Sequence, residues 1–184
     1  MNEHIIDGYR IGVLFSDAEI AARVKTLADE IAHRKPSRLL VVPILKGSFI
    51  FAADLIRAMH HAGLSPEVDF MILSSYRAAS QSSGQVTVLR DIETDVRDRD
   101  VLLIDDILES GRTLAFAKDL LSARGAGSVW AAVLLNKPGH LAASVGADFE
   151  GFTCPDKFVV GYGMDMAHQF RELPFIGHVK SPTD

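Results

Sequence analysis

Apolar residues recur with helical spacing close to the start of the chain. Ser16 and Glu19 form a capping-box pattern, in which a hydroxyl and a carboxylate satisfy free N–H groups of the first helical turn. The apolar positions after this box fall on one helical face: Ile20, Val24, Leu27 and Ile31. The spacing predicts an amphipathic helix over about residues 17–34.

Beyond this helix, apolar runs of strand length alternate with segments of helical character. The predicted strands cover residues 39–45, 67–74, 86–90, 101–104 and 129–135. Ser48 is placed to cap a helix that runs to about His61. Ser110 is placed to cap a further helix over residues 113–124. Strands that alternate with helices indicate an α/β fold with a parallel core sheet.

Two segments depart from this alternation. Residues 77–85 hold three serines and a glycine, which predicts a mobile surface loop. After Lys137, frequent glycines interrupt short aromatic and β-branched runs, which indicates a cap over the sheet. We expect a single domain over residues 1–184, with a core at about 36–140 and a small hood from the N-terminal residues and about 141–184.

Charge and cysteine content restrict the partners and the cellular compartment that we expect for the protein. The net charge of −5 and the isoelectric point near 5.8 argue against nonspecific binding to nucleic acid or to an anionic membrane. The longest apolar run, residues 39–45, is too short to cross a bilayer, and the N-terminus lacks the pattern of a secretory signal. The one cysteine, Cys154, fits a reducing compartment. We therefore expect a cytoplasmic protein without disulfides.

The stretch VLLIDDILESGRT at residues 101–113 carries the clearest chemistry. A buried strand leads to two carboxylates, Asp105 and Asp106. Small and hydroxyl residues follow where the next helix begins: Ser110, Gly111, Arg112 and Thr113. Free N–H groups, hydroxyls and the positive end of the helix dipole favour a phosphate at this turn, and the carboxylates suit ribose hydroxyls or a hydrated Mg²⁺. The stretch predicts a site for a phosphorylated ribose; the alternative is that these residues only cap the strand and the helix.

Several segments, taken in order, resemble the purine phosphoribosyltransferases of the hypoxanthine or hypoxanthine-guanine type. The matching pieces are LKGSFIFAADL at 45–55, SSY at 74–76, VLLIDDILESGRTL at 101–114, Lys137, PDKFVVGYGMD at 155–165, and Arg171 with LPFIG after it. The resemblance implies a type I phosphoribosyltransferase-like fold, an α/β fold with a parallel core sheet flanked by helices and a small hood subdomain. It also implies Mg²⁺-dependent transfer of the 5-phosphoribosyl group from phosphoribosyl pyrophosphate to N9 of hypoxanthine or guanine. The products would be IMP or GMP and pyrophosphate, in purine salvage.

The resemblance assigns roles to residues that would hold the sugar and its phosphates. Asp105 and Asp106 correspond to carboxylates that hold the ribose hydroxyls and metal-bound water. The turn from Glu109 to Thr113 corresponds to the cradle of the 5-phosphate. Lys46 and Gly47 match a loop that binds pyrophosphate, where family members often have a cis peptide before the lysine.

Further matches concern the metal and a closing loop. Asp165 matches a carboxylate that ligates Mg²⁺, and Arg171 matches an arginine that contacts pyrophosphate oxygens. Ser75 and Tyr76 match the start of a flexible loop that closes over the reaction. Closure of such a loop would exclude water from an oxocarbenium-like transition state.

The same resemblance places the purine base. Lys137 matches a lysine that donates to the purine O6, which disfavours the 6-amino group of adenine. Phe158 matches an aromatic residue that stacks on the base, and the backbone of Val159 matches groups that contact its far edge. Glu109 stands where family members usually have an aspartate that acts as the base, while Asp105 stands where glutamate is more common. The longer Glu109 side chain must therefore fold back to reach N7.

Other interpretations compete with this one. A regulator with the same fold would bind its ligand and RNA without catalysis, which the acidic isoelectric point disfavours. A phosphoacceptor receiver domain is disfavoured because too little of the chain follows Asp106. Within the enzyme class, a guanine- or xanthine-preferring transferase is the main alternative. The resemblance also implies a homo-oligomer, dimer or tetramer, whose ligands are phosphoribosyl pyrophosphate and a 6-oxopurine.

Overall fold

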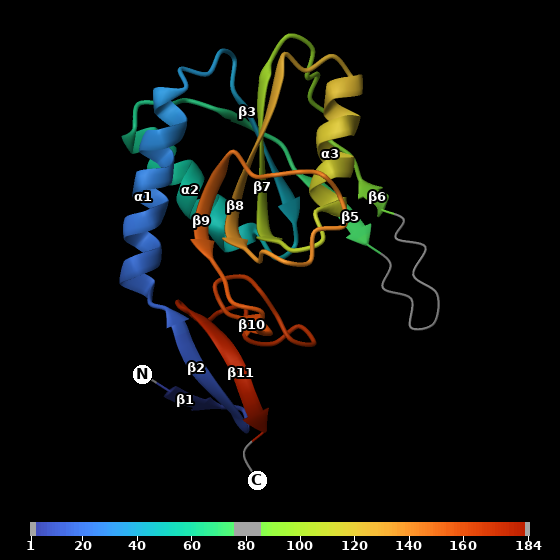
Figure 1. The fold of residues 1–184 in the computed structure, drawn as a ribbon. Coiled ribbons are helices and arrows are strands. Elements are labelled where there is room, and N and C mark those ends of the chain that lie inside the picture. Colours follow the sequence, from blue (N-terminus) through green and yellow to red (C-terminus); the bar gives the residue numbers. More distant parts are fainter. Residues whose placement is uncertain (1–2, 76–85, 183–184) are drawn as a thin grey trace.

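A core sheet with helices on both faces dominates the structure, a computed structural model that describes residues 3–75 and 86–182 (Figure 1). In spatial order the strands are β6 (Val86–Arg90), β5 (Met71–Ser75), β3 (Leu40–Leu45), β7 (Asp100–Leu108), β8 (Ser128–Asn136) and β9 (Phe149–Thr153), and β4 (Glu67–Val68) pairs with the start of β3. Every pair in this sheet is parallel except β5 with β6. The expected parallel α/β core is confirmed. Tyr76 and the predicted loop at 77–85 lie outside the described residues.

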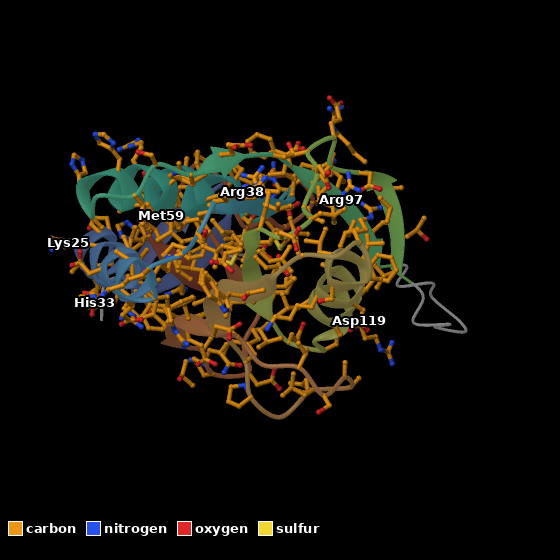
Figure 2. All side chains as sticks on the ribbon, turned by 90° about the horizontal axis from the view of Figure 1, so that it is seen from above. Lys25, His33, Arg38, Met59, Arg97 and Asp119 are labelled. Carbon is orange, nitrogen blue, oxygen red and sulfur yellow. The ribbon has the colours of Figure 1, made fainter. Side chains whose placement is uncertain are left out.

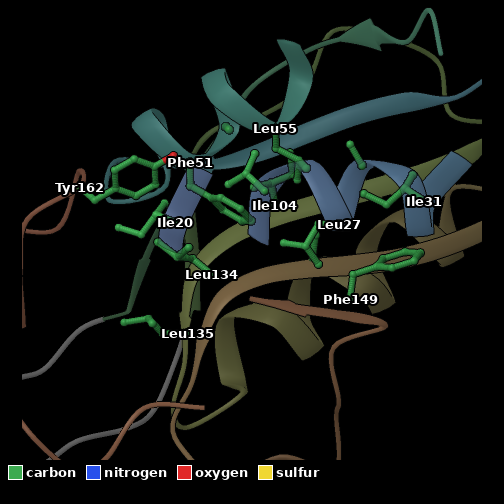
Figure 3. Close-up of a cluster of buried hydrophobic side chains, with 14 of the residues drawn as sticks. Ile20, Leu27, Ile31, Phe51, Leu55, Ile104, Leu134, Leu135, Phe149 and Tyr162 are labelled. Carbon is green, nitrogen blue, oxygen red and sulfur yellow. The ribbon is translucent and has the colours of Figure 1, made fainter. Parts of the chain in front are cut away.

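In the described residues three helices cover this sheet, which separates two apolar layers. α1 (Asp17–His33) and α2 (Phe49–His61) lie on one face, and α3 (Arg112–Ala123) lies on the other (Figure 1). Figure 3 shows the first layer, in which Leu27 of α1 and Leu55 of α2 pack over Ile104 of β7. Among the described residues, none of the helices has the length and apolarity that a membrane span requires.

The first helix follows its sequence pattern closely. The Ser16 hydroxyl accepts from Glu19 N at 3.3 Å, and the Glu19 carboxylate accepts from Ser16 N at 2.8 Å, so the predicted capping box is present. The four predicted apolar positions are all buried. Lys25 and His33 are on the exposed side of α1 (Figure 2). Helix α1 therefore lies where its hydrophobic stripe predicts.

Two predicted strands differ from the observed ones. Residues 67–74 form two short strands because the Asp69 side chain accepts from the backbone N–H groups of Phe70, Glu93 and Thr94 and turns the chain between β4 and β5. The strand predicted at 101–104 continues to Leu108, since β8 supplies ladder partners up to that residue. The two carboxylates at 105 and 106 consequently lie within the last part of β7.

Neither serine predicted to cap a helix does so with its side chain. Ser48 occupies the N-cap position directly before α2, as predicted, but its hydroxyl donates to the Ile44 carbonyl at 2.6 Å. The residue at the start of α3 is Gly111, with φ +74°, a left-handed conformation that glycine adopts without strain. The Ser110 hydroxyl lies 3.5 Å from Arg112 N, which is too long for an effective cap.

A second, antiparallel sheet forms the hood at the carboxyl ends of the core strands (Figure 1). Its order is β1 (Glu3–Ile6), β2 (Tyr9–Phe15), β11 (Ile176–Pro182) and β10 (Val159–Val160). Residues 149–153, which we expected in the hood, are instead strand β9 of the core sheet. Gly151 permits this pairing because its α-carbon packs on the carbonyl of Leu134 in β8, where a side chain would clash.

Candidate active site

The turn between β7 and α3 presents backbone donors at the start of a helix. The Ser110 carbonyl accepts from Ala142 N at 2.9 Å and from Ala143 N at 3.2 Å. Because the C=O and N–H of a trans peptide point in opposite directions, these bonds turn the N–H of Gly111 away from the 142–143 segment. Together with the free N–H groups of the first turn of α3, this geometry suits an anion.

Asp105 and Asp106 form a closely coupled pair of buried carboxyls beside this turn. Asp105 is only 9% exposed, and its Oδ1 accepts from Asp106 N at 3.0 Å. Burial raises the pKa of Asp105 well above its ordinary value, and the negative charge of Asp106 adds to the rise. Burial also raises the pKa of Asp106, whereas the positive charge of Arg171 opposes that rise. A cation or hydroxyl donors beside the pair would favour its ionised form.

The loop after β3 lies directly against this pair. The peptide between Leu45 and Lys46 is cis, as the resemblance implies, and the Lys46 side chain is exposed. A β-carbon on Gly47 would overlap the carboxylate of Asp106. Glycine at this position is thus what lets the loop approach the end of β7 so closely.

A charged group from the hood side completes this part of the site. Arg171 Nη2 lies 2.8 Å from Asp165 Oδ1, and Nη1 donates to the Gly163 carbonyl at 2.6 Å. Asp165 Oδ2 also accepts from His168 N at 2.8 Å. These contacts hold the guanidinium close enough to Asp106 to influence its pKa.

A second pair of charged residues lies at the ends of β7 and β8. Glu109 Oε1 is 3.6 Å from Lys137 Nζ, and Lys137 is only 7% exposed. Lys137 N donates to the Leu108 carbonyl at 2.9 Å, which holds the two chain segments together. Phe158 is 56% exposed, whereas the neighbouring Val159 is buried in β10. The structure thus has a half-buried carboxylate, a buried ammonium and, on the hood, an exposed ring.

The sequence model of the phosphoribosyl transferase domain matches residues 14–167. The chain belongs to the phosphoribosyltransferase family. It is 41% identical over 174 residues to the hypoxanthine phosphoribosyltransferase of Escherichia coli K12, which covers 93% of this chain and 96% of that protein. It is 43% identical over 169 residues to the hypoxanthine-guanine phosphoribosyltransferase of Bacillus subtilis 168, covering 91% and 92%. The crystal structure of a hypoxanthine phosphoribosyltransferase from Staphylococcus aureus superposes with a TM-score of 0.85 at 37% identity, covering 92% and 91%.

The predicted site residues of this phosphoribosyltransferase fall into contacting groups. Gly47 touches Asp106, Asp165 pairs with Arg171, and Glu109 pairs with Lys137. The turn from Ser110 to Thr113, predicted to bind phosphate, is half-buried around a buried Gly111, with the Arg112 side chain exposed. Ser75 is described by its backbone alone, at the end of β5, and Tyr76 lies outside the described residues.

Two residues that hold this phosphoribosyltransferase site together were missed at the sequence level. Gly163, with φ +100°, packs its α-carbon on the Gly47 carbonyl while its own carbonyl accepts from Arg171. Ser48 ties the loop after β3 back to Ile44. The glycine pair in the sequence GYG was a usable signal for a tight turn, whereas the serine had only its position to distinguish it.

Proposed function

We propose that this phosphoribosyltransferase transfers the 5-phosphoribosyl group of phosphoribosyl pyrophosphate to N9 of hypoxanthine, giving IMP and pyrophosphate in purine salvage. The observation that carries the proposal is the pair formed by Glu109 and Lys137 at 3.6 Å. In a 6-oxopurine the carbonyl O6 and the nitrogen N7 lie on one edge of the base. An ammonium that donates to O6 beside a carboxylate that accepts from N7–H matches that edge.

The base would lie between the ends of β7 and β8 and the hood. Lys137 donates to O6, and the exposed ring of Phe158 stacks on the purine face. The backbone of Val159 contacts the opposite edge of the base. Glu109 removes the N7 proton as N9 bonds to C1′ of the ribose, while the C1′–oxygen bond breaks and pyrophosphate leaves with that electron pair.

Phosphoribosyl pyrophosphate would span the turn after β7, the carboxylate pair, and the loop after β3 together with Arg171. The turn at Glu109–Thr113 binds the 5-phosphate, and Asp105 and Asp106 accept from the ribose hydroxyls. The pyrophosphate lies beside Lys46, Gly47 and Arg171, whose charges and N–H groups stabilise the leaving group. The carboxylates at 105 and 106 also stabilise the positive charge that develops on the sugar. Ser75 and Tyr76 begin the loop that closes over the reaction.

Phosphoribosyltransferases generally act with Mg²⁺, and the carboxylates of this chain fit that requirement. The described residues contain no cluster of three or more metal-ligating side chains that would hold an ion alone. Mg²⁺ is usually bound through one or two carboxylates together with substrate phosphates and water, so Asp165, Asp105 and Asp106 suit an ion that arrives with the substrate. When bound, Mg²⁺ neutralises charge on the departing pyrophosphate.

Pyrophosphate release from phosphoribosyl pyrophosphate and Mg²⁺ tests the proposal, with hypoxanthine, guanine, xanthine and adenine assayed in parallel. We expect turnover of 6-oxopurines and none of adenine. Turnover of guanine or xanthine above hypoxanthine would change the assigned substrate. Binding of phosphoribosyl pyrophosphate without any turnover would instead favour a noncatalytic regulator.

The setting of the enzyme is part of the proposal. We place it in the cytoplasm, as one domain with a core and a hood, acting as a homo-oligomer, a dimer or a tetramer. Its single cysteine supports a reducing compartment: Cys154 is buried and its thiol donates to the Pro155 carbonyl at 3.3 Å. Light scattering of the purified protein would give its oligomeric state.

A further inference from the structure

Three successive residues of the hood turn, at positions 161–163, have positive φ angles. Gly161 has φ +95°, Tyr162 has φ +49° and Gly163 has φ +100°. Glycine adopts such angles readily, but a side chain as large as tyrosine rarely does. Contacts elsewhere must therefore hold Tyr162 in this conformation.

The Tyr162 side chain supplies those contacts. It is 6% exposed and packs within the apolar layer of α1 and α2, beside Phe51 (Figure 3). Its hydroxyl donates to Asp54 Oδ2 of α2 at 2.7 Å. Burial and the carboxylate of Asp54 raise the pKa of Tyr162 above its ordinary value, so the hydroxyl remains a donor at any pH used for assays.

The backbone of the same turn supports Arg171. Gly163 N donates to the Arg171 carbonyl at 2.9 Å, and the Gly163 carbonyl accepts from the guanidinium at 2.6 Å. Tyr162 N donates to the Leu173 carbonyl at 2.8 Å. Tyr162, Asp54 and Arg171 also line one hollow of about 300 Å³. A shift of Tyr162 would therefore be transmitted to Arg171 through adjacent peptide groups.

The hydrogen bond from Tyr162 to Asp54, which we call the tether, is connected through Asp54 to the loop after β3. Asp54 belongs to α2, and the first residues before that helix are Lys46, Gly47 and Ser48. Gly163 packs directly on the Gly47 carbonyl. The bond from Tyr162 to Asp54 thus spans the two segments, one in the core and one in the hood, that face each other at the proposed pyrophosphate site.

We propose that Tyr162 is a positioning residue for pyrophosphate: its hydroxyl, bound to Asp54, fixes the 161–165 turn and Arg171 against the Lys46–Gly47 loop. The inference rests on the proposed function and adds a residue that touches no substrate. The tether acts mainly on the pyrophosphate end of the site. The purine residues Glu109 and Lys137 directly follow β7 and β8, and Phe158 and Val159 are held by β11, since Val179 N donates to the Phe158 carbonyl and Val159 pairs with His178. Loss of the hydroxyl should therefore weaken the binding of phosphoribosyl pyrophosphate and of pyrophosphate, but not the binding of the purine.

The test compares Tyr162→Phe with wild type in steady-state kinetics and in calorimetric titration with magnesium pyrophosphate. Since one hydrogen bond is lost and the ring is kept, we expect the KM for phosphoribosyl pyrophosphate and the Kd for pyrophosphate to rise about five- to tenfold. The KM for hypoxanthine should stay within about twofold. Tyr9→Phe is the matched control, because it removes a hydroxyl from the hood strand β2, and it should change neither constant.

Variants of Asp54 separate the tether from general damage to the fold. Asp54→Asn keeps an acceptor oxygen and should retain most of the wild-type affinity, whereas Asp54→Ala should reproduce Tyr162→Phe. The double variant Tyr162→Phe with Asp54→Ala should be no worse than either alone, since both remove one interaction. Equal rises in both KM values, or no rise in the Kd for pyrophosphate, would overturn the inference.

The two proposals fail in different ways. If wild type turns over hypoxanthine and Tyr162→Phe has the same kinetic and binding constants, the proposed function holds and the inference about Tyr162 is wrong. A wild-type protein without turnover removes the proposed function. In that case the titration with magnesium pyrophosphate decides the inference, because wild type should still bind more tightly than Tyr162→Phe and as tightly as Tyr9→Phe.

Discussion

Glu109 and Lys137 are each the residue that directly follows a core strand, and their side chains meet at 3.6 Å because Leu108 and Asn136 before them are register partners in β7 and β8. Two short sequence signals, separated along the chain, are thereby brought to one point by the parallel pairing. The carboxylate and the ammonium are therefore carried by the ends of two paired core strands, a placement that suits the proposed recognition of a small base.

The carboxylate of this pair should control the chemical step. We expect Glu109→Gln to lower kcat by about 10²- to 10⁴-fold, since an amide cannot accept the N7 proton. Glu109→Asp keeps a carboxylate but shortens its reach toward both N7 and Lys137, so a loss of about tenfold is expected. Rapid-quench measurement of the first turnover distinguishes this loss from slow product release. A Glu109→Gln enzyme with the wild-type rate would show that another group takes the proton.

The ammonium of the pair should control the choice of base. Lys137→Met keeps an unbranched side chain, shorter by one atom, and removes its donors, so kcat/KM for hypoxanthine should fall by about 100-fold or more, while the KM for phosphoribosyl pyrophosphate changes little. Discrimination against adenine should fall in parallel. Lys157→Met is the control, because Lys157 is an exposed lysine just before Phe158. Equal losses in the two variants would argue against a contact between Lys137 and O6.

Gly47 should tolerate no side chain. In Gly47→Ala the added methyl would overlap the Asp106 carboxylate, so the loop must withdraw from the end of β7. The KM for phosphoribosyl pyrophosphate should rise at least about tenfold while the protein stays folded. Gly146→Ala offers a matched change, because a β-carbon there has no neighbour within 4 Å in the described part of the chain. If Gly47→Ala keeps the wild-type KM, close approach of this loop is not needed for binding.

Asp105 should lower the free energy of unfolding of the ligand-free protein at neutral pH. Its pKa is raised by burial and by Asp106, so the folded state binds more protons than the unfolded state. The contribution of Asp105 to stability is then fully present below the ordinary pKa near 3.8 and is lost as the pH rises through the folded pKa. Asp105→Asn, which cannot ionise, should raise Tm at pH 7 by about 2–4 °C and abolish activity.

Measuring Tm of wild type and of Asp105→Asn at lower pH checks the predicted direction of the change in stability. The gain in Tm from Asp105→Asn should shrink between pH 7 and pH 4.5, because wild type recovers the stability that it loses on ionisation. Asp119→Asn removes an exposed carboxylate of α3 (Figure 2) and should show no such trend. A lower Tm for Asp105→Asn than for wild type at pH 7 would contradict the argument.

Local signals predicted the elements whose residues interact with near neighbours in the sequence. The capping box and stripe of α1 involve residues three to four positions apart, and the strand runs of β3, β7 and β8 are buried on both faces, so each pattern is complete in itself. The ends of elements depended on distant partners. β7 is longer than predicted because β8 supplies its ladder partners, and β4 ends early because Asp69 bonds to Glu93 and Thr94.

The site shows the same division. The turn after β7, which we propose binds the 5-phosphate, could be located from its carboxylates, its glycine and the helix that follows, all within one short stretch. The support from Ala142 and Ala143 to Ser110, and the packing of Gly163 on Gly47, join segments that are far apart in the chain. Such contacts depend on the topology of the sheet and the hood, which periodicity alone does not contain.

The hood pairs the two ends of the chain: in its sheet Gly12 of β2 lies opposite His178 of β11. Closing so long a loop is slow compared with pairing neighbouring strands of the core, so the hood sheet should form late in folding. On the ribosome, a partly made chain would already have the turn for the 5-phosphate but not the strand β11 that holds Val159 in place. We therefore expect the proposed active site to be complete only once β11 has been made and paired with β2 and β10.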